Sequence, residues 1–137
     1  MQGDEITREV TSIGDRIPKI IDPTTHAVLD YTTAGSFFAL GFAMLGRHRR
    51  ASTLAFINGG AVLGLSLFTD YPGGVWRKLS FRTHGMVDLM QAAMAATMPA
   101  LLGFAGDPEA QAFHAQAAVE LGVIAATDWR ATAAAAA

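Results

Sequence analysis

The chain has 137 residues, a net charge of −2 and no cysteine. Hydrophobic residues make up 51% of it and charged residues 16%, whereas about 25% of the residues of an average soluble domain are charged. This balance predicts a membrane protein. Ten Lys and Arg against twelve Asp and Glu leave no basic excess, which argues against a nucleic-acid partner. The absence of cysteine excludes disulfides, thiolate metal sites and cysteine nucleophiles.

Residues 1–22 precede the first apolar stretch and are predicted to form a short cytoplasmic or interfacial arm. Their alternating charges and the lack of a central apolar region argue against a cleavable signal peptide. Larger apolar residues recur in this arm at the spacing of an amphipathic segment, which suits a membrane surface or a partner. These residues are Ile6, Val10, Ile13 and Ile17.

Four apolar stretches follow, at residues 23–45, 51–69, 84–104 and 110–127. A helix of about 20 residues crosses a hydrocarbon core of about 30 Å, and about 17–25 residues are tolerated. The sequence therefore predicts an all-α integral membrane four-helix bundle. Asp22 before Pro23 is typical of a helix start. The fourth stretch contains Gln116 and Glu120, so we expect neighbouring helices to shield it from lipid.

An even number of spans places both termini and the loop at residues 70–83 on one side of the membrane. Seven of the ten basic residues fall on that side, and the turn at residues 47–50 holds the other three. The positive-inside rule therefore predicts a multi-pass protein of the bacterial inner membrane with cytoplasmic termini. The compact Arg-His-Arg-Arg turn opposes this orientation.

The polar residues of the two halves recur with an offset of 58 residues and without a gap. The pattern T-H-x3-D begins each half, and T-D-[YW] ends it. We therefore expect two parallel two-helix repeats, at residues 23–72 and 81–130, followed by a tail at 131–137. The alanines at 133–137 carry no chemistry. The repeated polar residues are Thr25, His26, Asp30, Thr69, Asp70, Thr83, His84, Asp88, Thr127 and Asp128.

Because both repeats insert in the same direction, all ten of these residues are expected to form one polar cluster at one membrane face. His26 and Asp30 are spaced i,i+4, as are His84 and Asp88, so each pair shares a helix face. Four aromatic residues are predicted to form a belt at the headgroup level near this face. They are Tyr31, Tyr71, Trp76 and Trp129.

Three interpretations of this cluster remain open. It can be a structural clasp in which Asp70 and Asp128 accept hydrogen bonds from the imidazoles or cap neighbouring helices. It can be a metal, haem or pigment site, with His26 and His84 as ligands of haem or bacteriochlorophyll, because neutral imidazole is a common ligand and a carboxylate often orients it. It can also handle protons or ions in a small ion-coupled transporter.

The same residues resemble the SPW-repeat family of small bacterial integral membrane proteins, whose two-helix units carry a Ser-Pro-Trp signature. The resemblance covers about residues 20–130 and rests on H-x3-D-Y (from His26), L-x-T-D-Y-x-x-G (from Leu67), a second H-x3-D (from His84) and M-P-A-L-L-G-F (from Met98). Ala100 stands where the family has its Trp. The resemblance implies a small multi-span membrane protein and carries no activity over to this chain.

No nucleophile–base set, phosphate-binding glycine loop or zinc-ligand spacing is visible in the sequence, so we expect no enzyme. His48, in the basic turn, is expected to face solvent or headgroups. The favoured function is a non-catalytic accessory or structural subunit of a larger membrane complex, of photosynthetic or respiratory electron-transport type. Its expected partners are other transmembrane subunits and membrane lipids, including bound lipid.

Overall fold

The computed structural model describes residues 2–132, so residues 133–137 of the predicted tail lie outside the described residues, as does the side chain of Val10. Within this range the protein contains helices and isolated bridges but no strands, which confirms the all-α prediction. The helices are α1 (Gln2–Arg16), α2 (Pro23–Met44), α3 (Arg49–Phe68), α4 (Phe81–Leu101) and α5 (Ala110–Ala126).

The two helices that begin the predicted repeats start with matching caps. The Asp22 side chain accepts a hydrogen bond from the backbone N–H of Thr25, and Pro23 occupies the first turn of α2. The Ser80 side chain accepts the corresponding bond from Thr83 at the start of α4. Side-chain oxygens at this position satisfy N–H groups that the first turn leaves unpaired.

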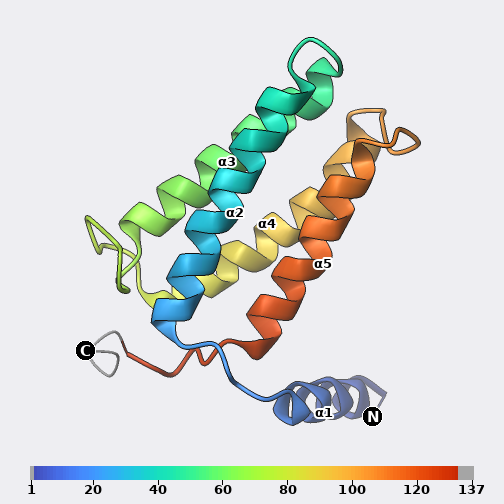
Figure 1. Cartoon of the computed structure of the whole chain (residues 1–137). Helices are drawn as coiled ribbons and strands as arrows, with labels where there is room; N and C mark the ends of the chain where they lie inside the picture. The colour runs from blue at the N-terminus through green and yellow to red at the C-terminus, as the bar shows by residue number, and fades with distance from the viewer. Residues whose placement is uncertain (1, 133–137) are drawn as a thin grey trace.

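Helices α2 and α3 form one antiparallel hairpin, and α4 and α5 form a second one beside it (Figure 1). The N-termini of α2 and α4 and the C-termini of α3 and α5 meet at one end of the bundle, which we call the cluster end. The opposite end holds the α2–α3 turn and the α4–α5 loop, and we call it the turn end. Figure 1 shows α1 across the cluster end, at an angle to the bundle helices.

Backbone contacts at the cluster end recur with the 58-residue offset. The N–H of Leu79 donates to Phe68 over 2.9 Å, and the N–H of Ile21 donates to Ala126 over 3.1 Å. The return bonds join Asp70 to Leu79 and Asp128 to Ile21. The segment before each hairpin is therefore bound to the end of the other hairpin, which holds the two hairpins at the same level.

Polarity is distributed unusually between the interior and the surface. Aromatic and small apolar side chains fill the turn end of the interior, where Phe37, Phe104 and Phe113 are fully buried. The interior also contains many polar side chains: His26, Asp30, Ser52, Asn58, Ser66, Thr69, His84, Asp88, Gln91 and Thr127. Large apolar side chains are exposed on all four bundle helices, among them Phe42, Ile57, Met90 and Val119.

Among the helices that the structure describes, α3 is long and apolar enough to be a candidate membrane span. A single helix of this kind is weak evidence, because the core helix of a soluble protein has the same properties. Four membrane spans and the inner-membrane location therefore stay predictions.

Candidate functional site

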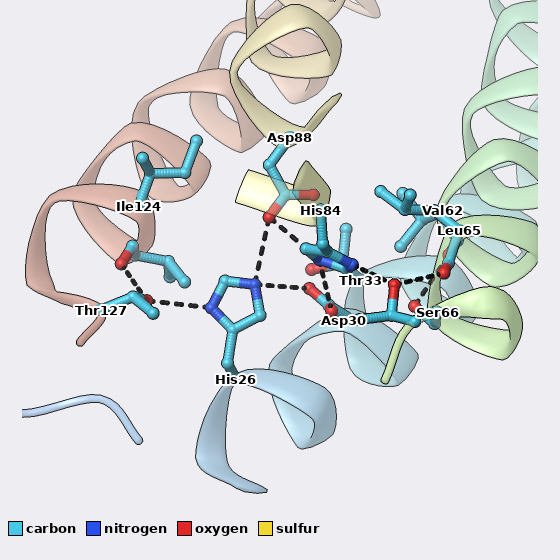
Figure 2. A network of polar contacts seen from close by, with 12 residues as sticks. His26, Asp30, Thr33, Val62, Leu65, Ser66, His84, Asp88, Ile124 and Thr127 are labelled. Atoms are coloured by element: carbon cyan, nitrogen blue, oxygen red, sulfur yellow. Dashed lines mark hydrogen bonds and ion pairs between the residues drawn. The ribbon is translucent and has the colours of Figure 1, made fainter. Parts of the chain in front are cut away.

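The candidate site is a group of four buried side chains at the cluster end, called here the His/Asp cluster. His26 and Asp30 lie one turn apart on α2, and His84 and Asp88 lie one turn apart on α4. Both imidazoles are 0% exposed, and the two aspartates are 8% and 6% exposed. Figure 2 shows all four side chains pointing toward one another from the two helices.

The Nε2 atoms of the two histidines face the carboxylates. His26 Nε2 lies 3.1 Å from Asp88 Oδ2 and 3.4 Å from Asp30 Oδ1. His84 Nε2 lies 3.1 Å from an oxygen of each aspartate. Each imidazole therefore contacts the carboxylate of its own helix and that of the other hairpin. The cluster joins the two hairpins through charged groups that water cannot reach freely.

The Nδ1 atoms of the same histidines face two threonine hydroxyls. His26 Nδ1 lies 2.9 Å from Thr127 Oγ1, and His84 Nδ1 lies 2.7 Å from Thr69 Oγ1. Each hydroxyl donates its single hydrogen to the backbone carbonyl four residues earlier, that of Val123 or Leu65. Both hydroxyls must therefore accept from the rings, so both Nδ1 atoms carry a hydrogen.

The hydrogens on Nδ1 decide what the centre of the cluster needs. A neutral ring that carries its hydrogen on Nδ1 presents a lone pair at Nε2. Two such lone pairs facing two buried carboxylates repel one another and leave two negative charges uncompensated, which is costly away from water. The centre therefore requires two further protons, shared between the Nε2 atoms and the carboxylates, or a cation that takes the place of those protons. Either addition brings +2 to the two carboxylates and makes the cluster neutral.

Tyr71 extends the network from the segment that follows α3. Its side chain is fully buried, and its hydroxyl donates to Asp30 Oδ2 over 2.8 Å. Burial of the phenol raises its pKa above the ordinary value, and the nearby Asp30 carboxylate raises it further. The hydroxyl therefore stays protonated and acts as a fixed hydrogen-bond donor to Asp30.

A cavity of about 20 Å³ adjoins the cluster between α2, α4 and α5. His26, Asp30 and Asp88 line one side of it, and Gln116 and Glu120 line another. The Glu120 Oε2 atom is buried and has no hydrogen-bond partner among the described residues. A cavity of this size has room for about one water molecule.

Six of the ten residues predicted for the polar cluster meet in the structure, and four do not. Those that meet are His26, Asp30, Thr69, His84, Asp88 and Thr127. Thr25 and Thr83 are exposed and offer their backbone N–H groups to the helix caps. Asp70 is exposed and lies 3.9 Å from Arg77, while Asp128 accepts from the backbone of Arg130.

The prediction that Asp70 and Asp128 accept hydrogen bonds from the histidines is therefore wrong. Both residues lie just beyond the last turn of a helix, where the backbone of the preceding threonine is extended, and Asp70 is exposed while Asp128 is half-buried. The partners of the histidines from these two segments are the threonines, whose hydroxyls lie beside Nδ1. Asp70 and Asp128 are therefore not members of the buried His/Asp cluster.

The predicted aromatic belt needs a similar correction. Trp76 is exposed, but Tyr71 is fully buried and belongs to the site. The half-buried Trp129 packs its ring against His26, with centroids 4.9 Å apart. Its ring also lies over Gly85, where an added Cβ would lie 2.9 Å from it. Gly85 leaves room for the Trp129 ring, and no motif around Gly85 in the sequence predicts this contact.

His48 was expected to face solvent or headgroups, and the structure gives it a specific role at the turn end. Its Nδ1 accepts from the backbone N–H of Ala51 and so caps α3. Its Nε2 lies 2.9 Å from Asp107 in the α4–α5 loop. The Arg50 guanidinium also bonds the carbonyls of Leu102 and Gly103. The basic turn therefore ties the two hairpins together.

The ligand capacity of the cluster can be judged from the same distances. One ligand atom from each of its four residues lies within 4.8 Å of all the others, a spacing at which one metal ion can contact all four. A tetrapyrrole does not fit between these atoms, because the adjoining cavity is about 20 Å³ and the His26 and His84 ring centroids are 5.2 Å apart. The arrangement disagrees with His26 and His84 as haem or bacteriochlorophyll ligands.

Comparison of the chain with protein-family models, with curated proteins and with solved structures gives no match. The resemblance to the SPW-repeat family stays a prediction.

Proposed function

We propose that this protein is a small multi-pass membrane protein that acts as a non-catalytic structural subunit of a larger membrane complex. The observation that carries the proposal is the distribution of polarity, with polar side chains inside the bundle and large apolar side chains outside. Soluble proteins seldom expose large contiguous apolar patches. Lipid tails accept such a surface, and interhelical polar contacts hold membrane bundles together.

Exposed apolar side chains occur at several levels of the bundle. Met86, Met90 and Leu101 on α4 are 70%, 66% and 71% exposed, and Phe42 on α2 is 67% exposed. The interior at the same levels contains Asn58, whose amide donates to the carbonyl of Leu54. A hydrogen-bonded polar interior under an apolar surface is the arrangement expected of a bundle in lipid.

The accessory role is supported by the parts of the chain outside the four bundle helices. Helix α1 leaves Ile6 and Ile13 exposed and lies across the cluster end (Figure 1), as an interfacial or partner-binding helix would. In this proposal the His/Asp cluster is the contact that locks two parallel repeats together. The host complex would be an energy-converting one of photosynthetic or respiratory type, and the relatives would be SPW-repeat proteins.

A pair of lysine substitutions tests the membrane location. A lysine at the centre of a membrane helix costs about 2.5–3.5 kcal/mol of insertion free energy. Met90→Lys, near the middle of α4, is therefore expected to reduce the yield in carbonate-washed membranes strongly. Ile13→Lys, at a similarly exposed position on α1, is the matched control and is expected to leave the yield unchanged. Wild type in the soluble fraction, or equal yields of both variants, would contradict the membrane location.

Gentle detergent extraction of the full chain tests the accessory role. The expected result is a particle much larger than the 14.4 kDa chain, with the same transmembrane partners in repeated preparations. The double variant Ile6→Lys and Ile13→Lys is expected to lose the partners that bind α1, without a change in helical content. A wild-type protein that runs as a lone monomer would remove the accessory role.

A further inference from the structure

We propose that the His/Asp cluster is a binding site for one divalent transition-metal ion of the zinc class. The ligands are Nε2 of His26, Nε2 of His84 and one carboxylate oxygen each of Asp30 and Asp88. The proposal does not depend on the membrane location, because it follows from atoms inside the bundle.

The ligand atoms are spaced closely enough for one ion. A tetrahedral zinc site with metal–ligand distances of about 2.0–2.2 Å has ligand atoms about 3.3–3.6 Å apart. Oδ2 of Asp88 lies 3.1 Å from Nε2 of each histidine, whereas Asp30 faces His26 with Oδ1 at 3.4 Å and His84 with Oδ2 at 3.1 Å. All four ligand atoms lie within 4.8 Å of one another, so the side chains would close in on a common zinc ion from this arrangement. Two imidazoles with two carboxylates suit zinc and its neighbours better than magnesium or calcium, which take oxygen ligands.

The ligands are also held in place by partners behind them. Metal-binding histidines almost always donate their other ring N–H to an oxygen, which fixes the tautomer and the ring orientation. Thr127 and Thr69 provide this acceptor for His26 and His84, and each threonine is held in turn by a backbone carbonyl. The Tyr71 hydroxyl holds Asp30 in the same way. Three of the four ligands are thus oriented before any ion enters.

One polar atom at the centre of the cluster is unsatisfied. His84 is fully buried, and its Nε2 atom has no hydrogen bond of acceptable geometry among the described residues, although two carboxylate oxygens lie 3.1 Å away. Buried polar atoms are normally paired, so an atom of this kind calls for a specific explanation. A metal ion would satisfy the Nε2 lone pair and neutralise both carboxylates at once.

The cavity beside the cluster leaves one side of the proposed metal site open to a further ligand. It lies between the aspartates and Glu120 and has room for about one water. A water there would reach the ion as a further ligand and hydrogen-bond the unpartnered Glu120 carboxyl oxygen. The site would therefore accept a fifth, exchangeable ligand from the α5 side.

Cobalt titration of the wild-type full chain in detergent is the deciding experiment. The protein is stripped with a chelator, its helical content is checked by circular dichroism, and Co²⁺ is added. We expect one equivalent of Co²⁺ to bind with the visible absorption of a four- or five-coordinate site, and one equivalent of Zn²⁺ to displace it. A folded wild-type protein that binds neither ion above background would overturn the proposal and leave a proton-linked clasp.

Variants assign the binding to the cluster. His84→Ala is expected to abolish the cobalt spectrum, whereas His48→Ala, which removes another His–Asp contact, is expected to retain it. Equal loss in both variants would overturn the assignment. Because His84→Ala can fail to fold, Thr127→Val provides a milder test that keeps all four ligands. Loss of this partner is expected to weaken Zn²⁺ binding about 10–100-fold, and an unchanged affinity would contradict the positioning role of Thr127.

Discussion

The two ends of the bundle each contain histidine–aspartate contacts, and these contacts differ in chemistry. At the cluster end, His26 Nε2 lies 3.1 Å from Asp88, and both side chains are buried. At the turn end, His48 Nε2 lies 2.9 Å from Asp107, whose side chain is 50% exposed. The distances are nearly equal, so distance alone cannot distinguish a surface hydrogen bond from a candidate metal site.

The difference comes from the partner of the second ring nitrogen. His48 Nδ1 accepts from a backbone N–H, so its hydrogen is on Nε2 and is donated to Asp107. His26 Nδ1 faces a hydroxyl that already donates elsewhere, so its hydrogen is on Nδ1. At the turn end, a neutral imidazole satisfies both hydrogen bonds of His48. The cluster end needs two further protons or one cation.

Removal of one aspartate from each end is expected to give the largest difference in stability between the two ends. Loss of one partner of a buried ion pair costs about 3–5 kcal/mol, while exposed pairs contribute about 0–1 kcal/mol. Asp88→Ala is therefore expected to lower the free energy of unfolding several times more than Asp107→Ala. Unfolding in detergent, followed by circular dichroism, measures both. Equal losses would mean that the cluster is not a buried charged network.

A pair of tyrosine substitutions sharpens the comparison between buried and exposed donors. The Tyr71 hydroxyl donates to the buried Asp30 carboxylate, whereas the Tyr31 hydroxyl donates to the exposed carbonyl of Gly73. Hydrogen bonds to charged groups contribute about 1.5–3 kcal/mol, against about 0.5–1.5 kcal/mol for typical ones. Tyr71→Phe is expected to cost more than Tyr31→Phe in the same unfolding assay. The reverse order would place Asp30 in a solvated environment.

Arg50→Ala tests how much the turn end contributes. The variant loses two exposed hydrogen bonds from Nη1 to the carbonyls of Leu102 and Gly103, at 3.0 and 3.2 Å. Water can replace the guanidinium at these carbonyls, so we expect a loss of about 1 kcal/mol or less. Arg49→Ala, which removes the neighbouring exposed arginine, is the control. A loss as large as that of Asp88→Ala would show that both ends hold the hairpins equally.

The ring tautomers can be tested without any change in stability. In metal-free protein labelled with ¹⁵N-histidine, we expect nuclear magnetic resonance to show a hydrogen on Nδ1 of His26 and His84. We expect the neutral form of His48 to carry its hydrogen on Nε2 instead. A His26 or His84 ring without a hydrogen on Nδ1 would remove the distinction between the ends.

Local sequence patterns were sufficient for the helical elements and for part of the site. Apolar stretches between charges predicted the positions of the four bundle helices, and Asp22 before Pro23 predicted the start of α2. The i,i+4 spacing placed each His with an Asp on one helix face. These features depend on residues within one turn of each other, where helical geometry alone sets which side chains are neighbours.

The identity of the cross-helix partners came from tertiary packing. The sequence could not predict that Thr127 and Thr69, rather than the adjacent aspartates, face the imidazoles, that Tyr71 is buried, or that Asp107 meets His48. These contacts depend on the rotation of each helix about its axis and on the direction of the chain after its last turn. The 58-residue spacing predicted which residues gather at one end of the bundle, while packing between the hairpins selected which of them touch.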